Sequence, residues 1–409
     1  MGEVPKIRFK GFNDDWEQRK LSEISDVRDG THDSPSYLSE GHPFVTSKNV
    51  KDGYINYDDI QYISDEDFEA INKRSKVDVN DILMGMIGTI GNLALIRTEP
   101  DFAIKNVALI KDTKQVSYLY LYHYLQSPNT EKQLLSGLDG GTQKFVSLKN
   151  IRELNIMVPS EAEQLRVGTF IESLDNLITL HQRKCDETKE LKKYMLQKMF
   201  PKNGENRPEI RFESFDDAWE QRKLGDLSVS FEYGLNAAAK EFDGTNKYIR
   251  ITDIDDESRE FNTGNLTSPD LDLSNADNYK LTKGDILFAR TGASVGKTYI
   301  YRESDGLVYY AGFLIRAKIK EDYDPEFVFQ STLTNQYEKF INVTSMRSGQ
   351  PGVNAQEYSQ YEIMVPKKAE QKKIAAYLRN IDNLITLHQN KCDELKDIKK
   401  YMLQNMFPQ

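Results

Sequence analysis

The strongest constraint on this chain is an internal duplication of a long polar segment. Residues Leu174–Pro201, LDNLITLHQRKCDETKELKKYMLQKMFP, return at the end of the chain as Ile381–Pro408, IDNLITLHQNKCDELKDIKKYMLQNMFP. Likeness at a period of about 200 residues is typical of a duplicated domain, because the units of solenoid proteins are far shorter. The chain is therefore expected to fold as two related halves, each carrying one copy of this segment.

Both copies of the segment have the periodicity of a long amphipathic helix. Apolar or small residues recur at alternating steps of four and three, with charged and amide side chains on the other faces, which is the heptad pattern of paired helices. One stripe on so polar a helix needs a partner to bury it, so a helix pair is favoured over an isolated core helix. The predicted seam consists of Leu174, Ile178, His181, Cys185, Thr188, Met195 and Met199, and of Ile381, Ile385, His388, Cys392, Leu395, Met402 and Met406.

Proline marks both ends of each predicted helix. The helices are expected to begin near Pro159–Gln164 and Pro366–Gln371 and to stop at Pro201 and Pro408, since proline cannot continue a helix. About 40 residues at about 1.5 Å rise per residue make a rod on the order of 60 Å long. Each copy of the duplicated segment is therefore expected to lie within such a rod.

Shorter motifs repeat as well, and their order is cyclic. The segment around Trp16, DWEQRKL, returns around Trp219 as AWEQRKL, an offset of 203 residues, whereas the segment IMVP returns from Ile156 to Ile363, an offset of 207. The second WEQRKL segment follows directly on the end of the first helix, while the first one opens the chain. With two-fold pseudosymmetry, the N-terminal segment would meet the end of the second helix, and the two helices would run antiparallel.

The middles of the two copies are unlike each other, and both have the pattern of an α+β domain. Short β-branched and aromatic runs alternate with Gly, Asn and Asp turns, which is typical of strands. In the first copy strands are expected at 43–50, 54–63, 81–87, 93–96 and 107–111, with helix at 117–127 and 131–136. In the second copy strands are expected at 248–252, 284–289, 297–301 and 308–318, with one helix over 325–340.

Composition places the chain among ordinary globular proteins. Of 409 residues, 38% are hydrophobic and 29% charged, no apolar run approaches the roughly 20 residues of a membrane span, and Met1–Lys6 has no hydrophobic signal core. The only cysteines are Cys185 and Cys392, which favours a reducing compartment and a cytoplasmic location. The net charge of −10 argues against a simple basic DNA-binding protein, so any DNA-binding charge must be local or supplied by a partner.

Taken in order, these motifs resemble the DNA-specificity subunit of type I restriction-modification systems over essentially the whole chain. The resemblance rests on two unlike recognition domains, each followed by a like helix, and on short segments within them. These segments are Asp15–Leu21, Gly284–Arg290 through Gly296, Ile363–Pro366 with Ala369–Gln371, and Leu384–Leu387. The implied fold is two α+β target-recognition domains, 1–159 and 202–366, and two spacer helices, 160–201 and 367–409, that form an antiparallel coiled coil with pseudo-two-fold symmetry.

The resemblance also implies a division of labour. Each recognition domain would bind one half of a bipartite site in double-stranded DNA, and the helices would fix the distance between the halves, as half-site spacing is fixed in dimeric DNA-binding proteins. Two modification subunits would dock on the helices, and restriction subunits would complete the nuclease. S-adenosylmethionine, ATP and Mg would belong to those partners, and the chain itself would carry no cofactor, no metal and no catalytic residue.

Residues that contact DNA are expected on polar, glycine-containing loops, because base edges are recognised by Arg, Lys, Asn and Gln, and phosphates by hydroxyl and backbone N–H groups. The Gln143 and Gln350 loops correspond through the offset of 207, and Met86 stands where the second copy has Arg290. The candidates are Thr31, His32, Lys105, Asn106, Gly141, Thr142, Gln143 and Lys144 in the first copy, and Arg290, Thr291, Lys297, Arg347, Ser348, Gly349 and Gln350 in the second.

Three other functions were weighed against DNA recognition. Gly292–Thr298 resembles a phosphate-binding loop, but it has three residues between its glycines where the Walker pattern has four. His181 with Cys185 and His388 with Cys392 have helical i,i+4 spacing suited to a zinc site, although small or hydrogen-bonded residues are also ordinary on a seam. The third alternative is a coiled-coil scaffold that assembles proteins without binding DNA.

Overall fold

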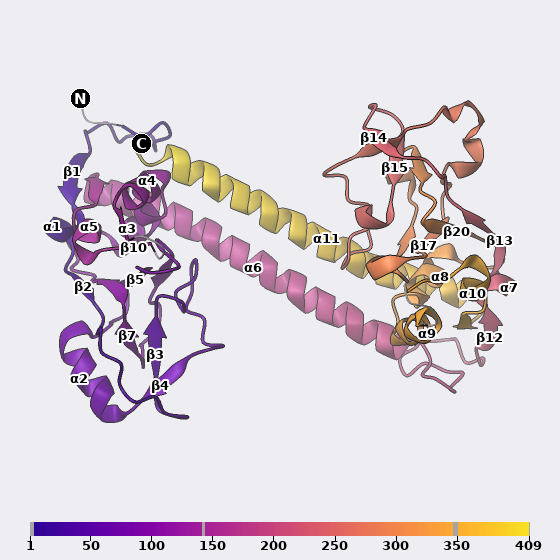
Figure 1. The fold of residues 1–409 in the computed structure, drawn as a ribbon, viewed down its shortest axis with the longest axis horizontal. Helices are drawn as coiled ribbons and strands as arrows, with labels where there is room; N and C mark the ends of the chain where they lie inside the picture. The colour runs from indigo at the N-terminus through magenta and orange to yellow at the C-terminus, as the bar shows by residue number, and fades with distance from the viewer. Residues whose placement is uncertain (1–3, 141–143, 347–350, 409) are drawn as a thin grey trace. The chain divides into compact units, whose positions relative to one another are not determined.

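The computed structural model describes residues 4–140, 144–346 and 351–408, and it divides into two compact units (Figure 1). Unit 1 comprises Met1–His181 together with Lys391–Gln409, and unit 2 comprises Gln182–Asn390. Each unit therefore contains one α+β domain, the start of the helix that follows it, and the end of the other long helix. No helix among the described residues is long and apolar enough to cross a membrane.

Unit 1 is built around a four-stranded antiparallel sheet in the order β2-β8-β5-β6, beside a mixed three-stranded sheet in the order β4-β3-β7. Strand β1 pairs with β11, and β9 with β10. The elements are β1 Glu17–Lys20, α1 Leu21–Ile24, β2 Val27–Asp29, β3 His42–Thr46, β4 Gln61–Ile63, α2 Asp65–Ser75, β5 Ile82–Gly85, β6 Leu93–Leu95, β7 Ala103–Lys105, β8 Val107–Ile110, α3 Tyr118–Leu125, α4 Pro128–Ser136, β9 Leu138–Asp139, β10 Phe145–Val146, α5 Leu148–Arg152, β11 Asn155–Val158 and α6 Glu161–Met199.

Unit 2 repeats this plan. Its four-stranded sheet has the order β13-β20-β17-β18, the parallel pair β15 and β19 corresponds to β3 and β7, and β12 pairs with β21. The elements are β12 Glu220–Lys223, α7 Leu224–Leu227, β13 Ser228–Tyr233, β14 Ala239–Glu241, β15 Lys247–Ile249, β16 Thr267–Pro269, β17 Ile286–Ala289, β18 Thr298–Ile300, β19 Val308–Tyr310, β20 Leu314–Ile319, α8 Pro325–Ser331, α9 Asn335–Ser345, α10 Ala355–Ser359, β21 Glu362–Val365 and α11 Lys368–Asn405.

The central strands of each sheet are covered on both faces, which explains why they are continuous apolar runs. In unit 1, Ile82 and Met84 of β5 join the core that faces the helices, while Leu83 joins a second core on the opposite face. In unit 2, Ile286 and Phe288 of β17 face the helices and Leu287 faces the second core. Alternate side chains of one strand thus fill two cores, because successive residues of a strand point to opposite faces.

Every residue of the seam predicted from the heptads is buried or half-buried. In unit 2 the Cys185 thiol lies 3.9 Å from the Ile385 carbonyl oxygen, and in unit 1 the Cys392 thiol lies 3.9 Å from that of Ile178. Matching ion pairs connect the helices, between Lys399 and Asp175 and between Lys192 and Asp382. Within each unit, residues later in α6 contact residues earlier in α11, so the two helices are antiparallel.

The cyclic arrangement is also confirmed. The N–H of Ile7 donates to the carbonyl of Asn405 at 2.9 Å, which brings both chain ends into unit 1 (Figure 1). The matching bond in unit 2 runs from Ile210 to Lys198, also at 2.9 Å. The segments that contain Ile7 and Ile210 are each held further by a bidentate ion pair between an arginine and a glutamate at the start of a long helix. The pairs are Arg8 with Glu163 and Arg211 with Glu370.

Several element predictions were wrong in detail. Helix α2 (Asp65–Ser75) was missed, although the Ser64 hydroxyl accepts from the N–H of Asp67 as an N-cap, a pattern visible in the sequence. The single helix expected over 325–340 is two helices, α8 and α9, separated at 332–334, where Thr332 and Thr334 bond back to preceding carbonyls. The strand expected over 308–318 is interrupted between β19 and β20, and 54–63 contributes only β4.

Candidate nucleic-acid interface

In unit 1, four predicted DNA-binding residues that are far apart in the sequence lie together. Thr31 forms a parallel bridge with Lys105, and its N–H donates to the Ile104 carbonyl at 3.1 Å. The Nδ1 atom of His32 lies 2.7 Å from Oδ1 of Asn106. The ends of β2 and β7 therefore present a hydroxyl, an imidazole, an ammonium and an amide on one edge of the unit.

The backbone at this edge explains the close approach. A side chain on Gly30 would collide with the carbonyl group of Ile104, so glycine allows the segment after β2 to cross β7. Asn106 has a φ of 52°, a conformation that Asn tolerates better than most residues. The ring of His32 is held at its other nitrogen by Asp29, at 3.0 Å, so its orientation is fixed from both sides.

The same crossing exists in unit 2, with different side chains. Gly234 approaches Ala311 as Gly30 approaches Ile104, and the N–H of Gly312 donates to the Leu235 carbonyl at 2.9 Å. By these hydrogen bonds Leu235, Asn236, Ala311 and Gly312 take the places of Thr31, His32, Lys105 and Asn106. The crossing borders a cavity of about 570 Å³ whose lining includes Tyr233, Asn236, Thr252, Arg290 and Phe313. Of these residues only Arg290 was predicted from the sequence, although the offset of 204 residues from Gly30 to Gly234 would have located Leu235 and Asn236 from Thr31 and His32.

Arg290 lies at the end of β17, on the border of this cavity. Its N–H donates to the carbonyl of Phe313 at 3.0 Å, and its carbonyl accepts from the N–H of Val353 at 2.9 Å. The guanidinium carbon lies 5.0 Å from the centre of the Tyr233 ring, a cation–π arrangement. Its counterpart Met86 is only 8% exposed and belongs to the core of unit 1, so that position offers no polar group to a ligand.

Seven of the predicted DNA-binding residues, in the two loops rich in Gly and Gln, lie outside the described residues. They are Gly141, Thr142, Gln143, Arg347, Ser348, Gly349 and Gln350. The chain on their C-terminal side is described in both units. Phe145 bridges Ile87, and Gly352 bridges Thr291. Ile87 and Thr291 directly follow Met86 and Arg290 in the chain, and the exposed Lys144 directly precedes Phe145.

Lys297 is engaged within unit 2. Its ammonium lies 2.5 Å from Asp256 and 3.3 Å from the Ile254 carbonyl, and its side chain is only 10% exposed. The preceding Gly292–Ser294 is a single 3₁₀ turn rather than the start of an α-helix. A phosphate-binding loop needs a helix N-terminus and a lysine directed at the phosphates, and neither is formed here.

Comparison with known proteins shows the same two-part organisation. The family model described as the type I restriction modification DNA specificity domain matches residues 13–190 and again 216–397. The chain belongs to this family. The specificity domain is thus present in two copies, which confirms the resemblance found in the motifs.

Individual relatives span one or both copies. The chain is similar to the MjaVIII specificity subunit of Methanocaldococcus jannaschii, with 24% identity over 382 residues, covering 90% of this chain and 88% of that protein. It is similar to the EcoBI specificity subunit of Escherichia coli, with 26% identity over 167 residues, covering 39% and 35%. Its fold is similar to that of the type I restriction-modification S subunit from M. genitalium, with a TM-score of 0.64, 15% identity and 99% of each chain covered. These relatives are named specificity subunits or S subunits, and this chain carries two copies of the specificity domain.

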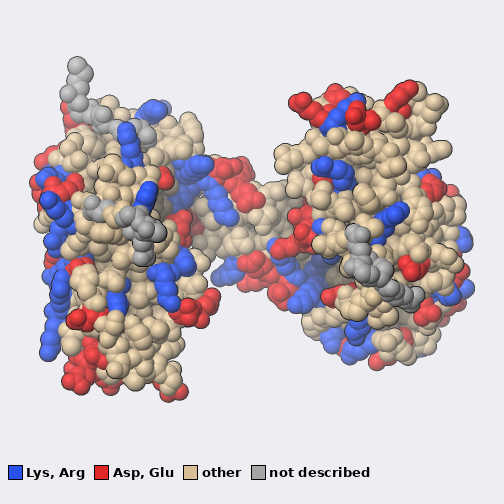
Figure 2. All heavy atoms as spheres, in the orientation of Figure 1, with Lys and Arg blue, Asp and Glu red and all other residues tan. Residues whose placement is uncertain are grey.

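The surface of this specificity subunit carries both signs of charge. In the view of Figure 2, Lys and Arg side chains are interspersed with Asp and Glu over both units. This distribution agrees with the net charge of −10. Contact with DNA through this chain therefore depends on individual placed side chains more than on a broad basic face.

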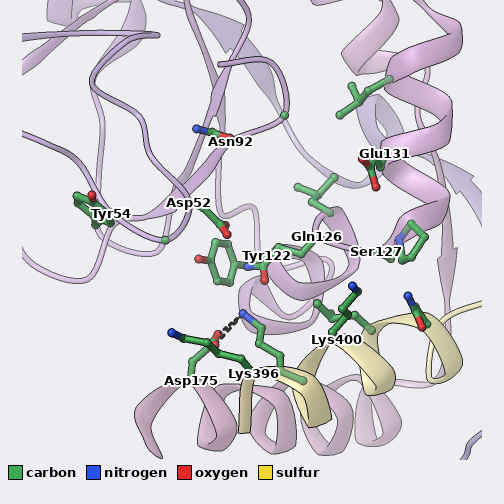
Figure 3. Close-up of a pocket in the computed structure, with 18 of the residues that line it drawn as sticks. Asp52, Tyr54, Asn92, Tyr122, Gln126, Ser127, Glu131, Asp175, Lys396 and Lys400 are labelled. Atoms are coloured by element: carbon green, nitrogen blue, oxygen red, sulfur yellow. Dashed lines mark hydrogen bonds and ion pairs between the residues drawn. The ribbon is translucent and has the colours of Figure 1, made fainter. Parts of the chain in front are cut away.

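Unit 1 of the specificity subunit also contains a large cavity, about 1170 Å³, between its α+β domain and the long helices. Tyr122 and Gln126 lie on one side of it, and Lys396 and Lys400 of α11 on the other (Figure 3). Asp175, which is ion-paired with Lys399, belongs to its wall. The cavity therefore lies where the recognition domain of unit 1 rests on its helices.

The one group of three potential metal ligands among the described residues is His123, Glu172 and Asp175, of which Asp175 lines the cavity. Arg97 donates to both oxygens of Glu172, and Lys399 pairs with Asp175, so both carboxylates are already neutralised by cations. Burial lowers the pKa of His123, while the neighbouring His123 ring and the Arg97 guanidinium lower the pKa of Glu172 to about 2. The group therefore fits an ion-pair network that joins the domain to its helix. The seam residues His181, Cys185, His388 and Cys392 form no such ligand group in the part of the chain that the structure describes.

Proposed function

We propose that this specificity subunit recognises an asymmetric, bipartite sequence in double-stranded DNA, one half with each unit. The observation that carries the proposal is that two units of the same topology present unlike side chains at matching positions. Thr31 and His32 correspond to Leu235 and Asn236, and Met86 corresponds to Arg290. Because base edges are distinguished by the donors and acceptors offered to them, unlike edges favour unlike half-sites rather than a palindrome.

In this proposal the recognition domains are residues 1–159 and 202–366, and the DNA-binding edge of each includes its Gly/Gln loop. Thr31, His32, Lys105, Asn106 and Lys144 are assigned to the first half-site. Arg290 and Thr291 are assigned to the second. Lys297 takes a supporting role, since its ion pair with Asp256 fixes the turn after β17.

The repeated helices 160–201 and 367–409 are proposed to determine the spacer and to dock two modification subunits. Support comes from apolar side chains that are exposed at matching positions away from the seam. Leu177 and Leu384 are 42% and 47% exposed, and Tyr194 and Tyr401 are 49% and 55% exposed. A surface that is repeated in sequence and in exposure suits a partner that binds twice. Restriction subunits would join the same assembly, and the partners would supply S-adenosylmethionine, ATP and Mg.

The test is to co-express the chain with its modification subunit and to map every methylated base in the host genome. The expected result is one motif made of two unrelated half-sites with a spacer of fixed length. A palindromic motif, or methylation without a sequence preference, would contradict the proposal. Retardation of a duplex carrying the mapped motif, compared with a scrambled duplex, separates DNA recognition from a scaffold function.

A further inference from the structure

We infer that Arg290, oriented by Tyr233, selects a guanine in the half-site bound by unit 2. This inference rests on the proposed function and assigns one base contact within it. It begins from an arginine whose charged group has no acidic partner among the described residues. The other arginines of unit 2 for which an ion pair is described are Arg183, Arg211, Arg222, Arg250, Arg302 and Arg316, which are bonded to Glu187, Glu370, Glu220, Asp253, Glu326 and Glu232.

The position of Arg290 is fixed at its backbone and at its tip. Both backbone polar groups are bonded, to Phe313 and to Val353, which holds the residue at the strand end. The guanidinium carbon lies over the ring of Tyr233, which is itself 45% exposed. This cation–π contact uses the positive charge and leaves the guanidinium N–H groups available as hydrogen-bond donors. The side chain is thus oriented before a ligand arrives, which lowers the entropic cost of binding.

The chemistry of such an oriented guanidinium matches guanine better than the other bases. Guanine offers two acceptors, O6 and N7, on its major-groove edge, and the arginine fork can donate to both at once. Cytosine offers a donor there, and adenine offers one acceptor beside a donor, so neither accepts two N–H groups. A phosphate could accept the same fork, but a phosphate contact would carry no base preference. The two cases are therefore separable by experiment.

The surroundings of Arg290 also differ from unit 1 in a way that favours a base contact. In unit 1 Asn106 is followed directly by Val107, whereas in unit 2 Phe313 is inserted between Gly312 and Leu314, the residues that take the same places. Phe313 is 58% exposed and, with Asn236, borders the cavity beside the guanidinium. Unit 1 has the buried Met86 in place of Arg290 and Asp29 in place of Tyr233. The pair of arginine and tyrosine would therefore act on one half-site only.

The experiment compares methylation motifs for Arg290→Lys, Arg290→Gln and Tyr233→Leu with the wild-type motif, each chain co-expressed with the modification subunit. Arg290→Lys keeps the charge and loses the planar fork. The expected result is loss of guanine preference at one position of one half-site, with discrimination falling by about 5- to 150-fold, as for a lost bidentate pair. Tyr233→Leu should weaken the preference at the same position, and Tyr233→Phe, which keeps the ring, should retain it.

The matched control is Arg222→Ala, an exposed arginine on β12 whose partner is Glu220, and its motif should equal that of the wild type. The inference is overturned if Arg290→Gln and Arg290→Lys keep the full guanine preference, or if they lower methylation equally at all sites, as loss of a phosphate contact would. In either case a bipartite wild-type motif would leave the proposed function standing. A wild-type motif without two half-sites would instead overturn the proposed function itself.

Discussion

His123 is a buried residue whose place in the duplicate is taken by a different side chain. It is fully buried, with its Nε2 atom 3.5 Å from a Glu172 carboxylate oxygen and its Nδ1 atom 3.9 Å from an Asp175 carboxylate oxygen. At the matching position of unit 2, Gln330 donates to both Glu326 and Asp382. Because burial lowers the pKa of His123, the folded protein protonates this ring only at a lower pH than the unfolded chain, which takes up a proton below about pH 6.5.

We expect His123→Gln to reduce the loss of stability of unit 1 at low pH. In the parent chain the unfolded state binds the extra proton, so the contribution of His123 is complete above about pH 6.5 and is lost as the pH falls below that value. The measurement is urea unfolding at about pH 7.5 and about pH 5, followed by Trp16 fluorescence in a Trp219→Phe background. An unchanged difference between the two pH values would show that His123 is not the titrating group.

Arg8 and Arg211 offer a matched pair of substitutions. Arg8 donates two bonds to Glu163, and the Glu163 side chain is 1% exposed. Arg8→Ala would leave a buried carboxylate unpaired and should destabilise unit 1 by about 3–5 kcal/mol. Arg211→Ala should do the same to unit 2 through Glu370. Trp16 and Trp219 are the only tryptophans, one in each unit, so single-tryptophan chains report the two effects separately. Equal loss of both signals in either variant would contradict this assignment.

At the scale of elements, Gly168 determines how closely α3 packs on α6. A Cβ atom at this position would lie 2.8 Å from the backbone nitrogen of Tyr120 and 3.1 Å from the carbonyl carbon of Leu119. The matching residue in unit 2 is the buried Ala375, so the second copy accommodates the methyl group. The close approach of α3 to α6 in unit 1 therefore depends on glycine at this position.

Gly168→Ala should destabilise unit 1, because the new methyl group meets backbone atoms that cannot rotate away. In an exposed helix the same change would stabilise by about 1 kcal/mol, so the sign of the effect distinguishes packing from helix propensity. The measurement is the unfolding midpoint reported by Trp16. A matched substitution is Ala375→Gly, which should destabilise unit 2 by helix propensity and by the cavity it leaves. A more stable Gly168→Ala protein would show that α3 can shift at little cost.

The elements that could be predicted from sequence are those with a repeating pattern. The heptad pattern predicted the seam and the antiparallel helix pair, because a polar helix has few ways to bury a single apolar stripe. Helix α2 and the break at 332–334 were missed because they depend on local capping by Ser64 and Thr334 within segments of mixed periodicity. Individual residues of the site could be predicted from their chemistry, but their arrangement in space could not. His32 and Asn106 were chosen for their chemistry, whereas their contact depends on Gly30 crossing β7, and Tyr233 was indistinguishable from an ordinary strand residue.

At the scale of the whole molecule, the proposed role of the helices leads to a quantitative prediction. A heptad inserted into α6 after His181 and another into α11 after Asn390 would preserve the seam, since seven residues is its repeat. Each insertion adds about 10 Å of helix, which corresponds to about three base pairs at 3.4 Å each. Methylation mapping should then give a longer spacer between unchanged half-sites. Altered half-site sequences with the old spacer would contradict the proposal.

The composition of the units predicts how a half-length chain would behave. Removing Gln182–His388, which is 207 residues, leaves 409 − 207 = 202 residues that contain the sequences of unit 1. In that chain Met406 and Phe407, which are buried in the core of unit 1, would end the same helix that begins at Glu161. They could fill the core of a second molecule only, so the expected product is a symmetric dimer that recognises a palindrome. Light scattering that shows a stable monomer would contradict this expectation.

The shared helices have a consequence for how such a gene can change. Asp175–Gln182 and Asp382–Gln389 are identical over eight residues, DNLITLHQ, and both lie close to the point where a long helix passes from one unit to the other. Recombination between the two encoding stretches would remove one recognition domain and rejoin the reading frame inside an unbroken heptad. The exchange of a whole domain between alleles, with junctions in the repeated helices, would keep every seam contact. New specificities are therefore available to this architecture by crossing-over, without any new interface having to form.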